Sequence, residues 1–303
     1  MMTGSQISPL AWVLLITLGV IWGGSFYWAE VALNALGPFT IVAFRLALGA
    51  VFLWVVIMVQ GLRLPRRAAD WGRLFVMGLL NNALPFSLIV WGQQFIEGGL
   101  ASILNATTAL FGAVVAGLLL TDERLSAHKI AGALIGIWGI GVAMGGEAFR
   151  ALDPRSLGQL AILAAALCYS FAGVWAKTQL RAFSPALSAF GMVVTGALIM
   201  IVVAITREGW PSFDYAPAVW RALIGISFLA TGCAYLLYFK ILELAGSANL
   251  MLVTLLVPPS AIALGWFYLN EEIGYEAWIG FAIIALGLSV TDGRLLKLFR
   301  GRR

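Results

Sequence analysis

Amide side chains stand in the middle of long apolar segments of this 303-residue sequence. Asn81 and Asn82 lie near the centre of the segment 71–95, and Asn105 and Thr108 lie three residues apart in the next segment. Residues with that spacing share one face of a helix. Polar groups in apolar segments are costly to place in lipid, so they usually face a bundle interior or a water-filled path. These residues are therefore expected to line a solute-binding cavity.

Hydroxyl and aromatic side chains occur at similar depths in other apolar segments, where they suit hydrogen bonding and packing against a small molecule. Together with the amides, the candidate substrate-binding residues are Trp22, Ser25, Asn81, Asn82, Trp91, Gln94, Asn105, Thr108, Tyr169, Trp175, Tyr235, Tyr238 and Asn249. Some of them have a simpler explanation. Thr108 and Thr254 are equally suited to bonding within their own bundle. Trp91 and Tyr238 fall near segment ends, where an aromatic belt at the membrane interface is common.

Pro85 follows the two adjacent amides of the third segment. Proline has no backbone N–H, so it removes one hydrogen bond from a helix and favours a kink. At membrane depth a freed carbonyl is tolerated where it is buried in protein or lines a cavity. We therefore expect a kinked helix with a free carbonyl that faces the cavity.

Arg45 is the one cation inside an apolar segment. In a structural role it would pair with Glu30 or cap the carbonyls of a neighbouring helix. In a functional role it would attract a substrate carboxylate. The structural role is favoured at this point.

Few residues here suit catalysis or metal binding. The single histidine, His128, excludes a His-rich metal site, and no Ser–His constellation or P-loop appears. Cys168 and Cys233 lie inside apolar segments, where a small buried hydrophobic role is expected. The sequence therefore predicts no enzyme, cofactor or metal site.

The segment interiors also contain no Asp or Glu. Proton-coupled export of cations normally needs a carboxylate at membrane depth. Deep clusters of Lys or Arg, which phosphorylated solutes would need, are absent as well. A cavity of amide, hydroxyl and aromatic groups favours a zwitterionic or uncharged solute, and amino acids, aromatic ones especially, fit it.

The elements that hold these residues follow from composition. Hydrophobic residues make up 61% of the chain and charged residues 11%. A water-soluble domain cannot hide that much apolar surface, so the expected partner is a lipid bilayer. The net charge of +5 sits between the apolar segments and predicts no nucleic-acid binding.

The expected fold is an all-α membrane protein, because each apolar segment has about the 20 residues that a helix needs to cross a bilayer. The ten predicted spans are Leu10–Ala29, Pro38–Val59, Trp71–Phe95, Leu100–Leu120, Ala127–Gly145, Leu157–Lys177, Pro185–Thr206, Pro217–Phe239, Ser247–Leu269 and Tyr275–Thr291. With the N-terminus inside, cytoplasmic segments hold 14 Lys and Arg and outer segments hold 4. This bias predicts that both termini are cytoplasmic. Because Met1–Pro9 carries no Lys or Arg, the first segment is expected to be a retained helix and not a cleaved signal.

The sequence repeats itself at half its length. Gly117, Glu123, Leu125, Gly132 and Gly139 recur 148 positions later as Gly265, Glu271, Ile273, Gly280 and Gly287. We expect two homologous halves, 1–149 and 150–303, each with five helices. An odd number of helices makes the second half enter the membrane from the opposite side, which is the layout of many alternating-access transporters. The glycines of the fifth and tenth spans are expected to allow close helix contact.

Several motifs make the chain resemble the EamA family of the drug/metabolite transporter superfamily. They are Trp22-Gly23-Gly24-Ser25-Phe26, Gly37-Pro38, Phe44-Arg45, Glu123-Arg124-Leu125 and Glu271-Glu272-Ile273. The resemblance covers nearly the whole chain. It implies that the first, third, fourth, sixth, eighth and ninth spans line the pathway, with the fifth and tenth at the periphery. Leu110 departs from the family, which usually has proline there, whereas the second half has Pro258-Pro259.

Resemblance and residues together lead to one functional hypothesis. We expect an inner-membrane, alternating-access transporter of a small molecule that exports amino acids or similar metabolites, as the YddG-like amino-acid exporters do. Facilitated diffusion, or coupling through a site not visible in the sequence, is the expected energy source. The alternatives are a carrier of nucleotide sugars or other anions that uses Arg45 and Lys177, and a membrane-embedded enzyme. A monomer is expected, and a homodimer is left open.

Overall fold

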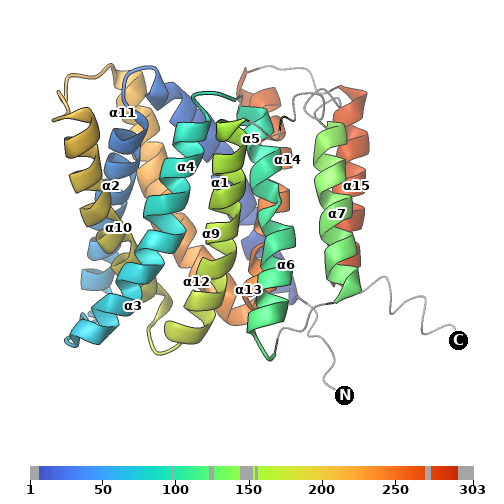
Figure 1. Ribbon diagram of the computed structural model, residues 1–303, viewed down its shortest axis with the longest axis horizontal. Helices are drawn as coiled ribbons and strands as arrows, with labels where there is room; N and C mark the ends of the chain where they lie inside the picture. Colours follow the sequence, from blue (N-terminus) through green and yellow to red (C-terminus); the bar gives the residue numbers. More distant parts are fainter. Residues whose placement is uncertain are drawn as a thin grey trace, which may run out of the picture.

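The computed structural model describes residues 7–96, 98–122, 126–143, 153, 156–269 and 274–292. Helices make up its regular structure, and the described residues include no strand. Figure 1 shows the helices standing side by side with their axes along one direction. The acidic-turn residues Glu123 and Glu271 lie outside the described residues, as do Glu97, Arg150, Arg155 and the C-terminal basic residues.

The helices follow the apolar segments closely. In chain order they are α1 (Pro9–Leu33), α2 (Pro38–Val59), α3 (Ala68–Gly78), η1 (Leu79–Ala83), α4 (Leu84–Gly92), α5 (Gly98–Ala106), α6 (Thr108–Leu119), α7 (Ala127–Ala143), α9 (Leu157–Gln179), α10 (Pro185–Glu208), α11 (Pro217–Ile224), η2 (Gly225–Cys233), α12 (Ala234–Ala245), α13 (Ser247–Leu250), α14 (Val253–Leu269) and α15 (Tyr275–Asp292). Prolines begin α2, α10 and α11, because the first helical position needs no N–H and favours the fixed φ of proline.

Seven helical segments in the described part are long and apolar enough to cross a membrane, and three shorter apolar helices accompany them. The long segments are Pro9–Leu33, Pro38–Val59, Ala68–Gly92, Leu100–Leu119, Leu157–Gln179, Pro185–Glu208 and Pro217–Ala245. Each predicted span falls on one of these ten stretches, although the first runs on to Leu33 and the third ends at Gly92. Three of the ten stretches are only the shorter apolar helices, so the number of crossings stays a prediction.

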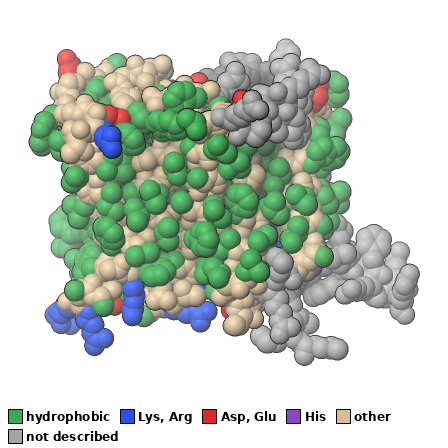
Figure 2. Space-filling model, in the orientation of Figure 1, with side chains coloured by type: hydrophobic (Ala, Val, Ile, Leu, Met, Phe, Trp, Pro, Cys, Tyr) green, Lys and Arg blue, Asp and Glu red, His purple; other side chains and the backbone are tan. Residues whose placement is uncertain are grey.

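The outer surface is apolar over most of its height. Val51, Met58, Leu198 and Val202 are exposed on α2 and α10. Figure 2 shows hydrophobic side chains across this face of the molecule, with Lys and Arg gathered mainly along its lower edge. An apolar band with charges at an edge is the surface that a lipid environment requires.

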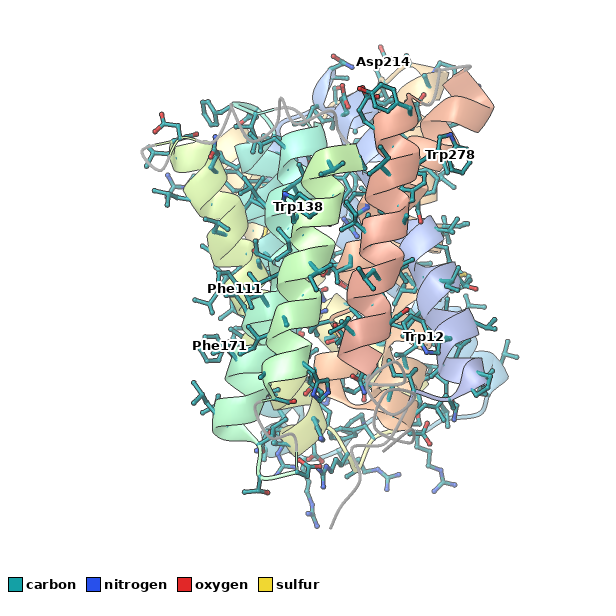
Figure 3. All side chains as sticks on the ribbon, turned by 90° about the vertical axis from the view of Figure 1, so that its right-hand side faces the viewer. Trp12, Phe111, Trp138, Phe171, Asp214 and Trp278 are labelled. Atoms are coloured by element: carbon teal, nitrogen blue, oxygen red, sulfur yellow. The ribbon has the colours of Figure 1, made fainter. Side chains whose placement is uncertain are left out.

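Helices α7 and α15 form a close antiparallel pair at one end of the bundle. A Cβ added to Gly132 would lie 2.6 Å from the carbonyl oxygen of Gly287, and one on Gly139 would lie 3.0 Å from that of Gly280. Side chains at these positions would separate the helices, so the glycines permit the contact, as expected. Figure 3 shows both helices on the outside of the bundle, away from the pocket described below.

The two halves pack by one scheme. Helix α4 lies against α9 as α12 lies against α1, α6 against α9 as α14 against α1, and η1 against α10 as η2 against α2. Helices α2 and α10, which correspond to each other, pack together; Glu208 of α10 accepts hydrogen bonds from Phe39 N and Thr40 N at the start of α2, at 3.0 and 2.8 Å. The halves are therefore interleaved and share one core.

Both η1 and η2 are wide helical turns of the π type, and they occupy corresponding positions of the halves. Such turns are rare and are frequent at functional sites. Pro85 follows η1 and cannot donate to the carbonyl of Asn81, four residues earlier. The Tyr235 hydroxyl lies 3.4 Å from that oxygen and donates to it. The freed carbonyl expected from Pro85 thus has a partner from the second half.

Candidate substrate-binding pocket

A buried pocket lies between the two halves at mid-height of the bundle. Side chains from α1, α2, η1, α4, α5, α6, α9, α12, α13 and α14 line it. The volume open to water-sized spheres is about 60 Å³, which is several times the roughly 10–15 Å³ that one water needs. Polar groups on its wall can therefore be reached by a small solute.

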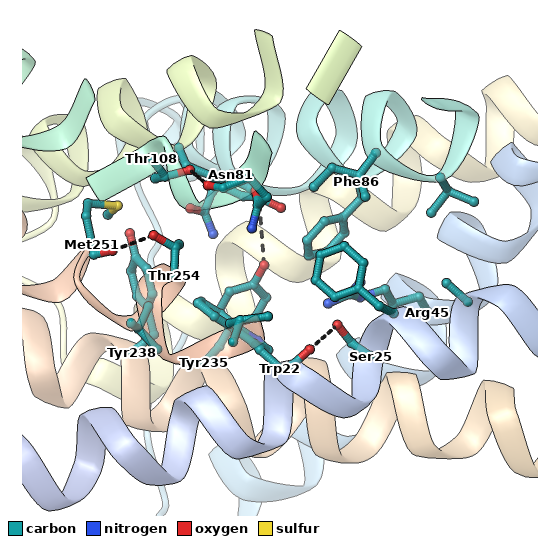
Figure 4. Close-up of a pocket in the computed structure, with 18 of the residues that line it drawn as sticks. Trp22, Ser25, Arg45, Asn81, Phe86, Thr108, Tyr235, Tyr238, Met251 and Thr254 are labelled. Carbon is teal, nitrogen blue, oxygen red and sulfur yellow. Dashed lines mark hydrogen bonds between the residues drawn. The ribbon is translucent and has the colours of Figure 1, made fainter. Parts of the chain in front are cut away.

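Eight of the predicted site residues come together in this pocket. They are Trp22, Ser25, Asn81, Asn105, Thr108, Tyr169, Tyr235 and Tyr238. They come from five apolar segments of the chain and are brought together only by helix packing. Figure 4 shows Asn81 and Thr108 on one side, across from Trp22, Tyr235 and Tyr238.

Asn82 points into the packing between helices and not into the pocket. It is fully buried, its Nδ2 donates to Met192 O of α10 at 3.1 Å, and its Oδ1 accepts from the Tyr235 hydroxyl. Successive helical residues are rotated by about 100°. Adjacent amides therefore cannot face the same way, and the tertiary packing decides which one faces the pocket.

The other predicted residues lie near the ends of the bundle. Trp91 packs on Phe95 with ring centroids 4.9 Å apart, and Gln94 is exposed beside them. Trp175 donates from Nε1 to Arg73 O at 3.0 Å. Asn249 lies on a second cavity, at the same end of the bundle as Trp175, and its Nδ2 donates to Ala245 O at 2.9 Å.

Several pocket residues were absent from the predicted set. Three of them, Gln93, Thr254 and Arg45, are polar residues that the sequence already shows within or beside apolar segments. Phe86 is apolar, and only the structure shows that it lines the pocket. Arg45 is 7% exposed. No ion pair joins it to Glu30 or to any other described carboxylate. Of the two structural roles expected for Arg45, the structure shows the second, a hydrogen bond to a carbonyl of a neighbouring helix.

Arg45 and Trp22 of the first half share one carbonyl of the second. Ala230 O in η2 accepts from Trp22 Nε1 at 3.0 Å and from Arg45 Nη2 at 3.3 Å. Arg45 Nε also donates to Thr231 Oγ1 at 2.9 Å, and its Cζ lies 3.6 Å from the centroid of the Phe86 ring. The backbone of η2 therefore positions a guanidinium and an indole on the pocket wall.

Aromatic rings form much of the remaining wall. Trp22 meets Tyr235 edge to face, with centroids 6.4 Å apart, and Phe86 meets Tyr169 at the same separation. Tyr238 packs against both Trp22 and Tyr235. Edge-to-face pairs hold each ring in one orientation. The wall is thus a preformed apolar surface for a ligand side chain.

Four buried side-chain polar atoms in the described residues have no hydrogen-bond partner. They are Asn81 Oδ1, Gln93 Oε1, Asn105 Oδ1 and Tyr238 Oη. All four belong to residues that line this one pocket. Buried polar groups are normally paired, and each exception needs an explanation such as a ligand or water. The pocket therefore carries unmet hydrogen-bonding capacity in one place.

Lys177, a candidate for anion binding, lies away from this pocket. Its Nζ is 2.8 Å from Asp122 Oδ2, at the end of the bundle where α6 and α9 meet. The hydrogen bond from Lys177 holds the pKa of the Asp122 carboxyl below its usual value. The described residues contain no cluster of three or more potential metal ligands.

Comparisons with known proteins agree with this geometry. The EamA-like transporter family matches twice, over residues 10–145 and 156–291. The chain is 26% identical over 275 residues to the uncharacterized transporter YoaV of Bacillus subtilis, covering 90% of this chain and 94% of that protein. It is 24% identical over 306 residues to a probable terminal-alkyne amino-acid exporter of Streptantibioticus cattleyicolor, covering 98% and 97%.

The fold also matches a solved structure. A crystal structure 20% identical in sequence superposes with a TM-score of 0.77 and covers 95% of this chain and 98% of that one. At this identity the likeness concerns the fold alone. Since the family matches most of the chain and its helices are long and apolar, the protein is a multi-pass membrane protein of the EamA-like transporter family.

Proposed function

We propose that the protein exports neutral amino acids, aromatic ones especially, or similar small metabolites through the pocket between its halves. One observation carries the proposal: all four unpaired buried polar atoms of the described side chains gather in this aromatic-walled pocket. A site with a few polar groups in an apolar wall suits a solute with a polar head and an apolar side chain. The relative named as a probable amino-acid exporter supports this substrate class.

Alternating access is the proposed mechanism, with 1–149 and 150–303 as two inverted five-helix repeats that make ten crossings. The two family matches, the sequence offset of 148 and the recurring helix pairings support this division. Inverted repeats permit an outward-open and an inward-open state when the halves exchange conformations. The pocket lies within one chain, so a monomer suffices for this mechanism.

The proposed location is the inner (plasma) membrane with both termini in the cytoplasm. The excess of Lys and Arg in one set of connecting segments, 14 against 4, supports this orientation. The cations along one edge in Figure 2 agree with it.

The proposed energy source is the substrate gradient itself. The pocket wall carries amide, hydroxyl, aromatic and guanidinium groups, and none of its described residues is Asp or Glu. A carboxylate that binds protons and substrate in turn is therefore missing from the described wall.

Exchange across proteoliposomes tests the function. Vesicles preloaded with unlabelled L-phenylalanine or L-leucine should accumulate the labelled amino acid, and a pH gradient should not change the rate. Asn105→Leu removes an unpaired pocket amide and should reduce the exchange at least about tenfold, because a ligand hydrogen bond at a buried site is lost. Ser289→Ala, on the exposed face of α15, is the matched control and should exchange like the wild type.

Two results would overturn parts of the proposal. Vesicles that hold folded protein but exchange no better than empty vesicles would exclude amino-acid transport. Exchange that requires a pH gradient would exclude the uncoupled mechanism.

A further inference from the structure

Among the described residues, one charged side chain lies on the pocket wall, Arg45. More than nine-tenths of its surface is buried. Guanidinium groups stay protonated in proteins, so this position carries a full positive charge. A buried charge is costly unless it is paired and hydrogen-bonded.

The hydrogen bonds of Arg45 hold its orientation but leave part of it free. Nε donates to Thr231 Oγ1 and Nη2 donates to Ala230 O. Those two contacts use two of the five N–H groups that a guanidinium carries. Both acceptors are neutral, and no carboxylate among the described residues pairs with Arg45. The Phe86 ring covers one face of the guanidinium, so the remaining N–H groups lie along its planar edge.

The unpaired atoms elsewhere on the wall are hydrogen-bond acceptors, whereas Arg45 supplies donors. Asn81 Oδ1, Gln93 Oε1 and Asn105 Oδ1 are acceptors, and the Tyr238 hydroxyl can also accept. Figure 4 shows Asn81 on the far side of the pocket from Trp22, with Arg45 and Ser25 toward one end. Acceptor oxygens without donors suit a protonated amine, which brings up to three N–H groups.

We infer that the pocket recognises a zwitterion, with the Arg45 guanidinium binding the substrate carboxylate and the amide oxygens of Asn81 and Asn105 binding its protonated amine. This inference rests on the proposed function and adds the residues that select the substrate. Bidentate geometry between guanidinium and carboxylate fixes the orientation of the bound molecule. The aromatic wall of Trp22, Tyr169 and Tyr238 then packs against the apolar side chain of the substrate.

The charge balance sets what the site rejects. An amine without a carboxylate would bring a second positive charge beside Arg45 and leave the guanidinium unpaired. A carboxylate without an amine would satisfy Arg45 but leave the amide oxygens without donors. Sites built from buried polar groups reject analogues that leave those groups unpaired.

A matched ligand series tests the inference on the full-length protein in detergent. The series is L-phenylalanine, phenethylamine and 3-phenylpropanoate, with L-leucine, 3-methylbutylamine and 4-methylpentanoate as a second set. The shift in melting temperature with concentration gives the affinity of each compound. In the wild type each amino acid should bind at least about tenfold more tightly than its amine and its acid, because each analogue lacks one charge-assisted contact.

Two variants separate recognition from packing. Arg45→Gln should weaken binding of the amino acid and of the acid at least about tenfold, while binding of the amine is unchanged or improved. Arg45→Lys keeps the charge but loses the planar fork, so it should retain the preference for a carboxylate with weaker affinity. If Arg45 only held the helices together, both substitutions would weaken all three compounds in parallel.

The outcomes distinguish this inference from the function on which it rests. Equal binding of L-phenylalanine and phenethylamine by the wild type would overturn the carboxylate assignment even if neither variant folds. Equal binding of L-phenylalanine and 3-phenylpropanoate would overturn the amine assignment and favour an anion carrier. Amino-acid exchange in vesicles without this discrimination would leave the function standing and remove the inference. No binding and no exchange of any compound would remove both.

Discussion

Asn81 and Asn82 are neighbours in the chain with opposite surroundings. Asn82 is hydrogen-bonded on both ends of its amide, to Met192 of α10 and to Tyr235 of α12. Asn81 has an unpaired Oδ1, and its Nδ2 reaches only the sulfur of Met192, at 3.8 Å. Both side chains are almost completely buried. Burial alone therefore does not distinguish an amide that holds helices together from one that is left to bind a ligand.

The difference extends to the regions around them. On the side of α10, polar groups pair with each other: Thr195 Oγ1, for example, donates to Leu74 O at 3.1 Å. On the pocket side, the amide oxygens of Asn81, Gln93 and Asn105 have no partner. Unpaired buried groups reduce stability. The pocket thus gives up stability that the α3–α10 contact retains, as a preorganised binding site does.

The largest effect on stability is expected at the paired amide. Asn82→Leu keeps the size of the side chain but removes the shorter of the two acceptors of the Tyr235 hydroxyl and one donor to Met192 O. The protein should lose about 1–3 kcal/mol, seen as a lower melting temperature in detergent. Adding Tyr235→Phe should restore part of the loss, because removing both partners is less costly than removing one. If Asn82→Leu alone were as stable as the wild type, the contrast between a paired Asn82 and an unpaired Asn81 would be wrong.

The matched change at the neighbouring amide should barely alter stability. Asn81→Leu removes a group whose oxygen is already unpaired. Without ligand, the free energy of unfolding should therefore fall by no more than about 0.5 kcal/mol, or rise. The stabilisation that L-phenylalanine gives the wild type should be lost. The same thermal scans with and without L-phenylalanine measure both. A large loss of stability without ligand would show that Asn81, like Asn82, holds the helices together.

A small effect on stability is expected where a polar pair meets water. Asp122→Asn removes the ion pair with Lys177. The Asp122 side chain is 49% exposed. Such surface pairs contribute about 0–1 kcal/mol. Glu243→Gln, which breaks the exposed pair with Lys240, is the control and should have a smaller effect still.

The pH dependence of this pair has a definite sign. The pKa of Asp122 is lowered in the folded protein by the Lys177 hydrogen bond. Its contribution is therefore complete above the ordinary Asp pKa of about 4 and is lost as pH falls through the lowered value. The difference in melting temperature between wild type and Asp122→Asn should stay constant from about pH 8 to 5 and shrink below about pH 4. A difference that grows on acidification would contradict the assignment.

Sequence reasoning found the general composition of the pocket. Mid-segment position and polarity indicated Asn81 and Asn105, and both line the pocket together with the aromatic candidates Trp22 and Tyr169. The same criteria could not separate Asn81 from Asn82. Phe86 had no signal, because an apolar residue in an apolar segment looks the same whether it faces lipid, core or cavity.

The sequence by itself determined that the chain lies in a membrane, that it is helical and that it belongs to a two-part transporter family. Lipid leaves backbone groups no partner except within a helix, so long apolar runs have one available structure. Only the tertiary structure decided which amide is paired and which groups meet Arg45. Arg45 and Thr231 are 186 residues apart in the chain. Contacts at that separation depend on how each helix is rotated against its neighbours, which the local pattern of apolar and polar residues does not fix.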